Sequence, residues 1–247
     1  MVAPKKVGTS FAKMIEDVQH LCYIYFRLMK STGAFTRHRT KVQVHIFMNE
    51  KFFDLKKEKQ DRMINASLKV FAMNGYEHAS TDDIVKEAAI SKGLLFHYFI
   101  SKLGLYSFIY DYSVRYIMLE LSTGVSPKET DYFKLLDQIK FAQLQVMKNY
   151  PYMLQFINSS NDEIVSEALV ETEDKRSVLP GQYAQIMERA DLGRFKKDTD
   201  VKMLTKMLAF TADGLMREQF MNGSFQPEIY YKETRQYFDM MKTLCYK

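Results

Sequence analysis

From Asp54 onward, apolar residues recur with the period of amphipathic α-helices, and short polar segments separate one helical stretch from the next. The helical pattern covers residues 56–74, 81–88, 92–99, 102–121, 129–150, 152–157, 161–175, 182–190, 198–221 and 228–245. No segment has a convincing strand pattern. The sequence therefore predicts an all-α fold.

Turn and capping residues mark the predicted boundaries. The expected N-caps are the cluster Ser80-Thr81-Asp82-Asp83, then Ser91 and Ser101. Asn74-Gly75 and Asn222-Gly223 are expected to end the helices that precede them. Pro180-Gly181 is expected to break the chain between two helices.

The net charge of +5 is unevenly distributed along the 247 residues. Residues 1–47 carry a net charge of +6, whereas the other 200 residues hold 27 basic against 28 acidic side chains, a net charge of −1. A positive net charge would favour nucleic acid as a partner. Here the positive charge lies in residues 1–47, so it gives no such indication for residues 48–247. A function in DNA binding must therefore rest on a motif.

Residues 1–47 form an N-terminal extension with two open interpretations. Their second half has no helical or strand period, and Met48 opens a stretch that resembles a natural chain start. The extension is either an upstream translation product or dispensable arm, or a basic arm that follows DNA phosphates. The predicted domains are this extension (1–47), a DNA-binding domain (48–104) and a helical domain (105–247).

The segment from Thr81 to Lys102 predicts a helix-turn-helix, in which the second helix enters the major groove. An apolar inner face can lock the two helices together, and it consists of Ile84, Val85, Ala88, Ile90 and Leu95. The side chains expected to point outward and read bases are Lys92, Leu94 and His97. Thr81, Tyr98 and Lys102 are suited to contact phosphates. The alternative is a helical pair within a larger bundle that never meets DNA.

The chain resembles the TetR family of one-component bacterial regulators over about 50 residues. The resemblance rests on Phe71-Ala72-Met73-Asn74-Gly75, Thr81, Ile84-Val85, Ala88 to Gly93, Leu95 to Phe99, Ser101-Lys102 and Leu105. It implies base reading by Lys92, Leu94 and His97, phosphate contact by Thr81, Tyr98 and Lys102, and close backbone approach at Gly93. Weaker support comes from Gly193-Arg194-Phe195 before a long helix with Asp213-Gly214.

Three positions depart from the family pattern. Ala89 stands where glycine is usual, so the turn is expected to place a non-glycine residue near the left-handed region, at a cost of about 1 kcal/mol. Phe96 replaces the usual tyrosine and removes a hydroxyl. Leu103-Gly104 follows Lys102 where a charged residue is common, and the glycine weakens the start of the helix.

The resemblance also implies a small, largely apolar effector held between helices of residues 105–247. This region has ten methionines and twelve tyrosines, which can line an adaptable pocket but also form an ordinary core. The candidate ligand-binding residues are Tyr116, Met147, Tyr152 and Met187.

The last two helices are expected to form a four-helix seam between two copies of the chain; a seam within one chain is the alternative. The residues assigned to this seam are Met203, Leu204, Met207, Leu208, Phe210, Thr211, Tyr230, Tyr237, Phe238 and Met241. Such a homodimer would engage a palindromic operator in double-stranded DNA.

Catalysis is not expected. No metalloprotease, thiol-redox, serine-nucleophile or phosphate-loop motif occurs, and no cofactor or metal is predicted. The paired acids Asp162-Glu163 and Glu173-Asp174 are interpreted as solvated faces. Cys22 and Cys245 suit a reducing compartment, and neither a secretory signal nor a membrane span is recognised, so a cytoplasmic location is expected.

Two functions remain. The favoured one is a ligand-responsive repressor that binds a palindromic operator as a dimer. The alternative is a DNA-bound protein without an effector, whose C-terminal domain recruits another protein.

Overall fold

The computed structural model describes residues 51–247, and this part of the chain contains ten α-helices, one short 3-10 helix and no strand. The predicted all-α fold is confirmed. The helices are α3 (Lys57–His78), α4 (Thr81–Glu87), α5 (Lys92–Phe99), α6 (Lys102–Gly124), α7 (Tyr132–Asn149), α8 (Met153–Ser160), α9 (Ser166–Arg176), α10 (Val178–Met187), η1 (Leu192–Arg194), α11 (Val201–Met221) and α12 (Pro227–Cys245). The N-terminal extension, residues 1–47, lies outside the described residues.

Side-chain caps begin the helices around the predicted helix-turn-helix. The hydroxyl of Ser80 accepts a hydrogen bond from the Asp82 amide at 3.1 Å, and that of Ser91 accepts one from the Leu94 amide at 3.2 Å. Ser101 caps α6 through the Gly104 amide at 3.0 Å. Each cap satisfies an amide that the first helical turn leaves without a partner, so these predicted starts are confirmed.

Glycines with positive φ interrupt or end helices where the sequence predicted. Gly75 has a φ of 66° near the end of α3, and the chain continues from there to His78 in one further turn. Gly223 has a φ of 65° just after α11. Glycine adopts this conformation without the steric cost that a Cβ would impose.

The predicted break at Pro180-Gly181 is wrong. Both residues lie inside α10, which begins at Val178. Proline is the third residue of this helix, where the amide has no intrahelical partner, so its missing N–H costs no hydrogen bond. The true boundary falls at Ser177, between α9 and α10.

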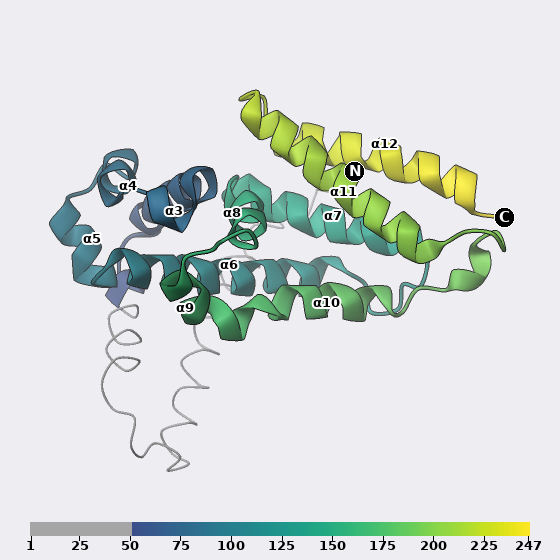
Figure 1. The fold of residues 1–247 in the computed structure, drawn as a ribbon, viewed down its shortest axis with the longest axis horizontal. Helices are drawn as coiled ribbons and strands as arrows, with labels where there is room; N and C mark the ends of the chain where they lie inside the picture. The colour runs from purple at the N-terminus through teal and green to yellow at the C-terminus, as the bar shows by residue number, and fades with distance from the viewer. Residues whose placement is uncertain (1–50) are drawn as a thin grey trace, which may run out of the picture. The chain divides into compact units, whose positions relative to one another are not determined.

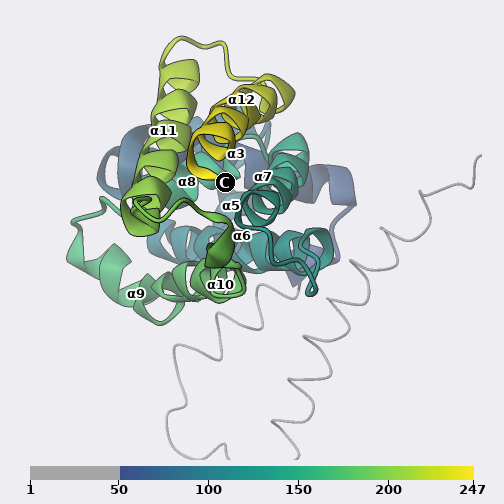
Figure 2. The same ribbon diagram turned by 90° about the vertical axis from the view of Figure 1, so that its right-hand side faces the viewer.

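Helix α6 leads from the helix-turn-helix into the C-terminal body, where it packs against α7 and α10 (Figure 1). The pair α11 and α12 lies against α7, on the side away from α10 (Figure 2). The main hydrophobic cluster extends without interruption from α3, α4 and α5 into α6, α7 and α8. The unit formed by α3, α4 and α5 is therefore packed directly on the body.

A second, smaller hydrophobic cluster packs the C-terminal end of the chain against α7 and α11. Phe195 packs edge-on against Tyr246, with ring centroids 4.9 Å apart. Arg194 pairs with the buried carboxylate of Asp131, the N-cap of α7. The Lys247 amide donates to the Arg194 carbonyl at 3.1 Å. The Gly193-Arg194-Phe195 segment thus joins α7 to the end of α12.

Among the described helices, none combines the length and the apolar composition required to cross a bilayer.

Candidate nucleic-acid interface

The helices α4 and α5 are joined by residues 88–91 and share an apolar inner face. Ile84, Ala88 and Leu95 are at most 1% exposed, while Val85 and Ile90 pack partly buried against the same cluster. This confirms the predicted inner face. Because three buried side chains from both helices interlock, the angle between α4 and α5 is held by packing.

Lys92, the first residue of α5, lies exposed at the surface beside the first turn of α4. Its Nζ is 2.8 Å from Asp82 Oδ1 and 3.0 Å from Oδ2, so the ammonium group is paired across the motif. The pair joins residues ten positions apart, and only the packing of α4 on α5 brings them together. Sequence reasoning identified Lys92 but missed its partner.

Gly93 and His97 complete the exposed side of α5. A Cβ built on Gly93 would meet no atom within 4 Å, so packing within the chain gives no reason for a glycine there. His97 is also exposed, and its ring lies against Tyr98 with centroids 4.9 Å apart. Lys92, Gly93 and His97 thus share a surface that the rest of the described chain leaves open.

Leu94 and Tyr98 are less accessible than the other predicted DNA contacts. Leu94 is half-buried and packs against the main cluster. Tyr98 is 9% exposed and makes an edge contact with Phe52, with ring centroids 5.8 Å apart. Both side chains help to seat α5 on its neighbours, and a DNA contact by either would involve only the edge of the side chain.

Thr81 and Lys102 flank the motif at the starts of two helices. Thr81 is the first residue of α4 and is half-buried. Lys102, the first residue of α6, donates to the carbonyls of Glu77 at 3.0 Å and Ala79 at 3.3 Å. Its Nζ also lies 4.6 Å from the centre of the Tyr76 ring. Lys102 therefore closes the end of α3 in this structure.

Two residues of the motif have left-handed backbone angles. Ala89 has a φ of 52°, which confirms the expectation drawn from its place in the turn. Ile100, directly after α5, has a φ of 63° and is 45% exposed. A β-branched residue in this region is unusual, and no signal in the sequence pattern distinguished Ile100.

The four candidate ligand-binding residues occupy two environments. Met147 is fully buried, and Tyr116 is 8% exposed. The Tyr116 hydroxyl accepts a hydrogen bond from Asn149 at 3.0 Å, and burial raises its pKa. Tyr152 and Met187 are half-buried at the edge of the main cluster, where Tyr152 packs on Phe220.

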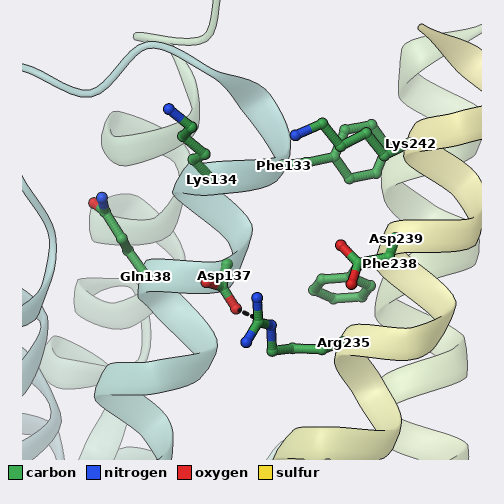
Figure 3. Close-up of a pocket in the computed structure, with 8 residues that line it drawn as sticks. All are labelled: Phe133, Lys134, Asp137, Gln138, Arg235, Phe238, Asp239 and Lys242. Carbon is green, nitrogen blue, oxygen red and sulfur yellow. Dashed lines mark ion pairs between the residues drawn. The ribbon is translucent and has the colours of Figure 1, made fainter.

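A groove of about 430 Å³ lies between α7 and α12, and none of these four residues lines it (Figure 3). Asp137 and Arg235 form an ion pair of 2.9 Å across it. The groove is lined by Phe133, Lys134, Asp137, Gln138, Arg235, Phe238, Asp239 and Lys242. Sequence reasoning did not identify this groove, because it depends on the packing of two helices about 100 residues apart in the chain.

The residues assigned to a seam between subunits divide mainly into two groups. Leu204, Leu208, Tyr230 and Phe238 are at most 4% exposed and pack within the chain. Met203, Met207, Phe210 and Tyr237 of the predicted seam are exposed, and so are Met240 and Leu244, which the sequence did not assign to it. Gly214 follows on α11, where an added Cβ would meet nothing within 4 Å. Four of the ten predicted seam residues are therefore internal, four belong to an exposed apolar face, and Thr211 and Met241 are half-buried.

Comparison with known proteins places the resemblance mainly on the helix-turn-helix segment. Residues 63–107 match the family model described as bacterial regulatory proteins, tetR family. The chain is 39% identical over 84 residues to the uncharacterized HTH-type transcriptional regulator YuxN of Bacillus subtilis (strain 168), covering 32% of this chain and 28% of YuxN. It is 49% identical over 41 residues to the HTH-type transcriptional regulator UidR of Escherichia coli (strain K12), covering 17% of this chain and 21% of UidR. These matches span less than a third of either relative.

Solved structures extend the likeness to the fold of the body. A TetR family transcriptional regulator from Chloroflexus aurantiacus J-10-FL superposes with a TM-score of 0.54 at 19% identity, covering 80% of this chain and 98% of that one. The fatty acid degradation regulator FadR from Bacillus halodurans gives a TM-score of 0.51 at 18% identity, covering 72% of this chain and 96% of that one. At these identities the likeness shows the fold alone.

Proposed function

Because residues 63–107 match the tetR family model, we propose that the chain is a transcriptional regulator of the TetR family. We propose that it reads a palindromic operator as a homodimer and represses transcription until an effector binds. The described domains would divide near Gly104, with DNA binding by residues 48–104 and effector binding and dimerisation by residues 105–247. As a DNA-bound regulator it would work in the cytoplasm.

The observation that carries this proposal is the open surface of α5. Lys92, Gly93 and His97 are exposed on a helix whose other side is locked into the hydrophobic cluster. A lysine can donate to guanine O6 and N7, and a histidine can donate or accept at base edges. The glycine permits close approach of the backbone. Leu94 at the rim would contact a thymine methyl group, while Thr81, Tyr98 and Lys102 would approach phosphates.

Dimerisation is proposed through the exposed apolar face of α11 and α12. Its contiguous large side chains, with Phe210 at 65% and Met203 at 68% exposure, are typical of a protein interface. A two-fold axis there would present two α5 helices to half-sites about 34 to 36 Å apart. Gly214 would let the partner's helix approach closely.

An effector is proposed to enter the body between helices near Tyr116, Met147, Tyr152 and Met187. Movement of α6 by the effector would change the separation of the two α5 helices, since α6 joins the body to the helix-turn-helix. Such coupling is typically about 1 to 3 kcal/mol, enough for a 5- to 150-fold loss of operator affinity. Repression would then be relieved.

Selection of bound DNA from a random pool tests the proposal. We expect an inverted repeat with a fixed spacing between its half-sites. A protein that enriches no inverted repeat at low salt would contradict the function. The alternative, a DNA-bound protein that recruits a partner without an effector, predicts no retained small molecule when the purified dimer is analysed by native mass spectrometry.

A further inference from the structure

The helix-turn-helix is attached to the body by directional polar contacts at both ends of α3. Near its start, Asp61 accepts a hydrogen bond from the hydroxyl of Tyr150 at 2.7 Å. Lys57 donates to the same hydroxyl at 3.0 Å and pairs with Asp61 at 2.5 Å. Tyr112 of α6 adds a hydrogen bond of 2.7 Å to Tyr150. One α3 carboxylate is thus joined to two tyrosines of the body.

The second attachment lies at the other end of α3, on Tyr76. The Tyr76 amide donates to Glu163 Oε2 at 3.0 Å, and its hydroxyl donates to Glu167 Oε1 at 2.5 Å. The tyrosine is 4% exposed, and burial together with the Glu167 carboxylate raises its pKa. Its hydroxyl therefore remains a protonated donor at physiological pH.

Glu163 connects this attachment to the start of α9. Its other carboxylate oxygen, Oε1, accepts from the amides of Ile164 at 3.0 Å and Val165 at 2.9 Å. One turn beyond Glu167, Glu171 accepts a hydrogen bond from Ser107 of α6 at 3.2 Å. Glu167 and Glu171 are four residues apart on α9 and share one side of that helix, while Glu163 lies in the segment just before it. The interpretation of Glu163 as part of a solvated face is wrong.

The two polar attachments lie on either side of an apolar contact between α3 and the body. The rings of Phe71, Tyr106 and Phe156 pack at this junction, with Phe71 and Tyr106 centred 5.1 Å apart. Close packing already opposes reorientation of α3 on the body, and directional hydrogen bonds at two separated points add to that restraint. Asp61 and Asn74, the last residue before the interruption at Gly75, are thirteen residues apart, about 20 Å along the helix, and Tyr76 lies just beyond that interruption. Hydrogen bonds at both points resist tilting of α3 about either one.

We propose that Tyr76 with Glu163 and Glu167, and Asp61 with Tyr150, are positioning residues that set the orientation of the reading helix relative to the body. In the dimer they would determine which half-site spacing the protein accepts. This inference rests on the proposed function, but the attachment itself exists in a single chain. Neither pair would need to touch DNA.

The test removes one hydroxyl at each point with Tyr76→Phe and Tyr150→Phe, singly and together. Tyr132→Phe is the matched control, because it loses a hydrogen bond of 2.7 Å to Thr205 that lies wholly within the body. Glu167→Gln keeps an acceptor for Tyr76 and serves as the conservative variant. Thermal unfolding identifies the variants that remain folded, and a misfolded double variant is replaced by the two single ones.

The first measurement needs neither DNA nor a dimer. Spin labels at His78→Cys and Lys148→Cys, in a Cys22→Ser/Cys245→Ser background, report the distance from the end of α3 to α7. The labelled chain is mixed with an excess of the unlabelled cysteine-free chain, so that a dimer carries labels on one subunit. We expect one narrow distribution in the parent chain and in Tyr132→Phe, and a broad or double one when both hydroxyls are missing. An unchanged distribution in the folded double variant would overturn the proposal.

The second measurement uses the selected operator and versions lengthened or shortened by one base pair. We expect the double variant to reduce the penalty for wrong spacing at least fivefold while its base preference within each half-site is kept. Tyr132→Phe and Glu167→Gln should retain the parent penalty. An unaltered penalty in the double variant would refute the positioning role. If the parent chain selected no inverted repeat, the proposed function would be refuted, but the distance measurement would still test the attachment of α3 to the body.

Discussion

The helix-turn-helix and the α11–α12 pair are both helical pairs with one buried side and one open side, but their open sides differ in chemistry. Around α5 the open residues are Lys92, Gly93 and His97, whereas on α11 and α12 they are Met203, Phe210 and other large apolar groups. A polar open surface with a gap at glycine suits the edges of bases. An apolar one suits a protein surface from which water is expelled. The buried sides of the two helical pairs are both apolar, so only the exposed sides indicate which kind of partner each pair would bind.

The largest effect is expected from a charge on the apolar face. Phe210→Asp would place a carboxylate where the proposed dimer excludes water, and should weaken dimerisation by about 3 kcal/mol, roughly 100-fold. Analytical ultracentrifugation should show a folded monomer with little operator affinity. Val170→Asp is the control, since Val170 is 72% exposed on α9, apart from this face. A dimeric Phe210→Asp variant would contradict the interface.

The next effect concerns the polar surface. Lys92→Ala should relax preference at one base position by about 1 to 3 kcal/mol, because a lysine bound to guanine is lost. Lys86→Ala, an exposed lysine in the last turn of α4, should leave that preference unchanged. Competition binding with operators altered at single positions measures both. Equal loss for every DNA sequence would assign Lys92 to phosphate instead.

A smaller effect is expected from the partner of Lys92. Asp82→Asn removes a negative charge from the proposed DNA surface and releases Lys92 from its ion pair of 2.8 Å. Affinity for all DNA should rise about two- to fivefold through reduced repulsion, while discrimination at the Lys92 base position falls. Asp83→Asn removes the same charge one residue further along and should raise affinity without changing discrimination. If the two variants had the same affinity and the same base discrimination, Asp82 would not orient Lys92.

The smallest effect tests the backbone of the turn. Ala89→Gly removes a cost of about 1 kcal/mol for a Cβ at a φ of 52°. The extra entropy of the unfolded glycine, about 0.5 to 1 kcal/mol, offsets most of this gain, so the fold should be stabilised by at most about 0.5 kcal/mol. Ile100→Gly, at a φ of 63°, should gain less because part of the isoleucine side chain is packed. Thermal unfolding measures both changes, and a lower melting temperature for Ala89→Gly would contradict the strain.

Structural features that depend on residues close together in the sequence could be predicted more reliably than those that depend on distant residues. Ser91 caps α5 through an amide three residues away, and Gly75 interrupts α3 through its own backbone angle, so both could be predicted from neighbours in the chain. Pro180 shows where local reasoning fails, because the same residue ends one helix or occupies the first turn of the next. Because the structure begins α10 at Val178, Pro180 lies in the first turn of that helix and does not end the preceding one.

By itself the sequence determined the helical class, the helix-turn-helix with its inner face, the strained turn at Ala89 and the resemblance of that segment to the TetR family. Each of these depends on spacing within a few turns. The tertiary structure alone decided that Glu163 and Glu167 bind Tyr76, that Lys102 closes the end of α3, and which side of α11 stays open. These outcomes join residues up to about 90 positions apart, and no local period specifies which distant side chain a helix will meet.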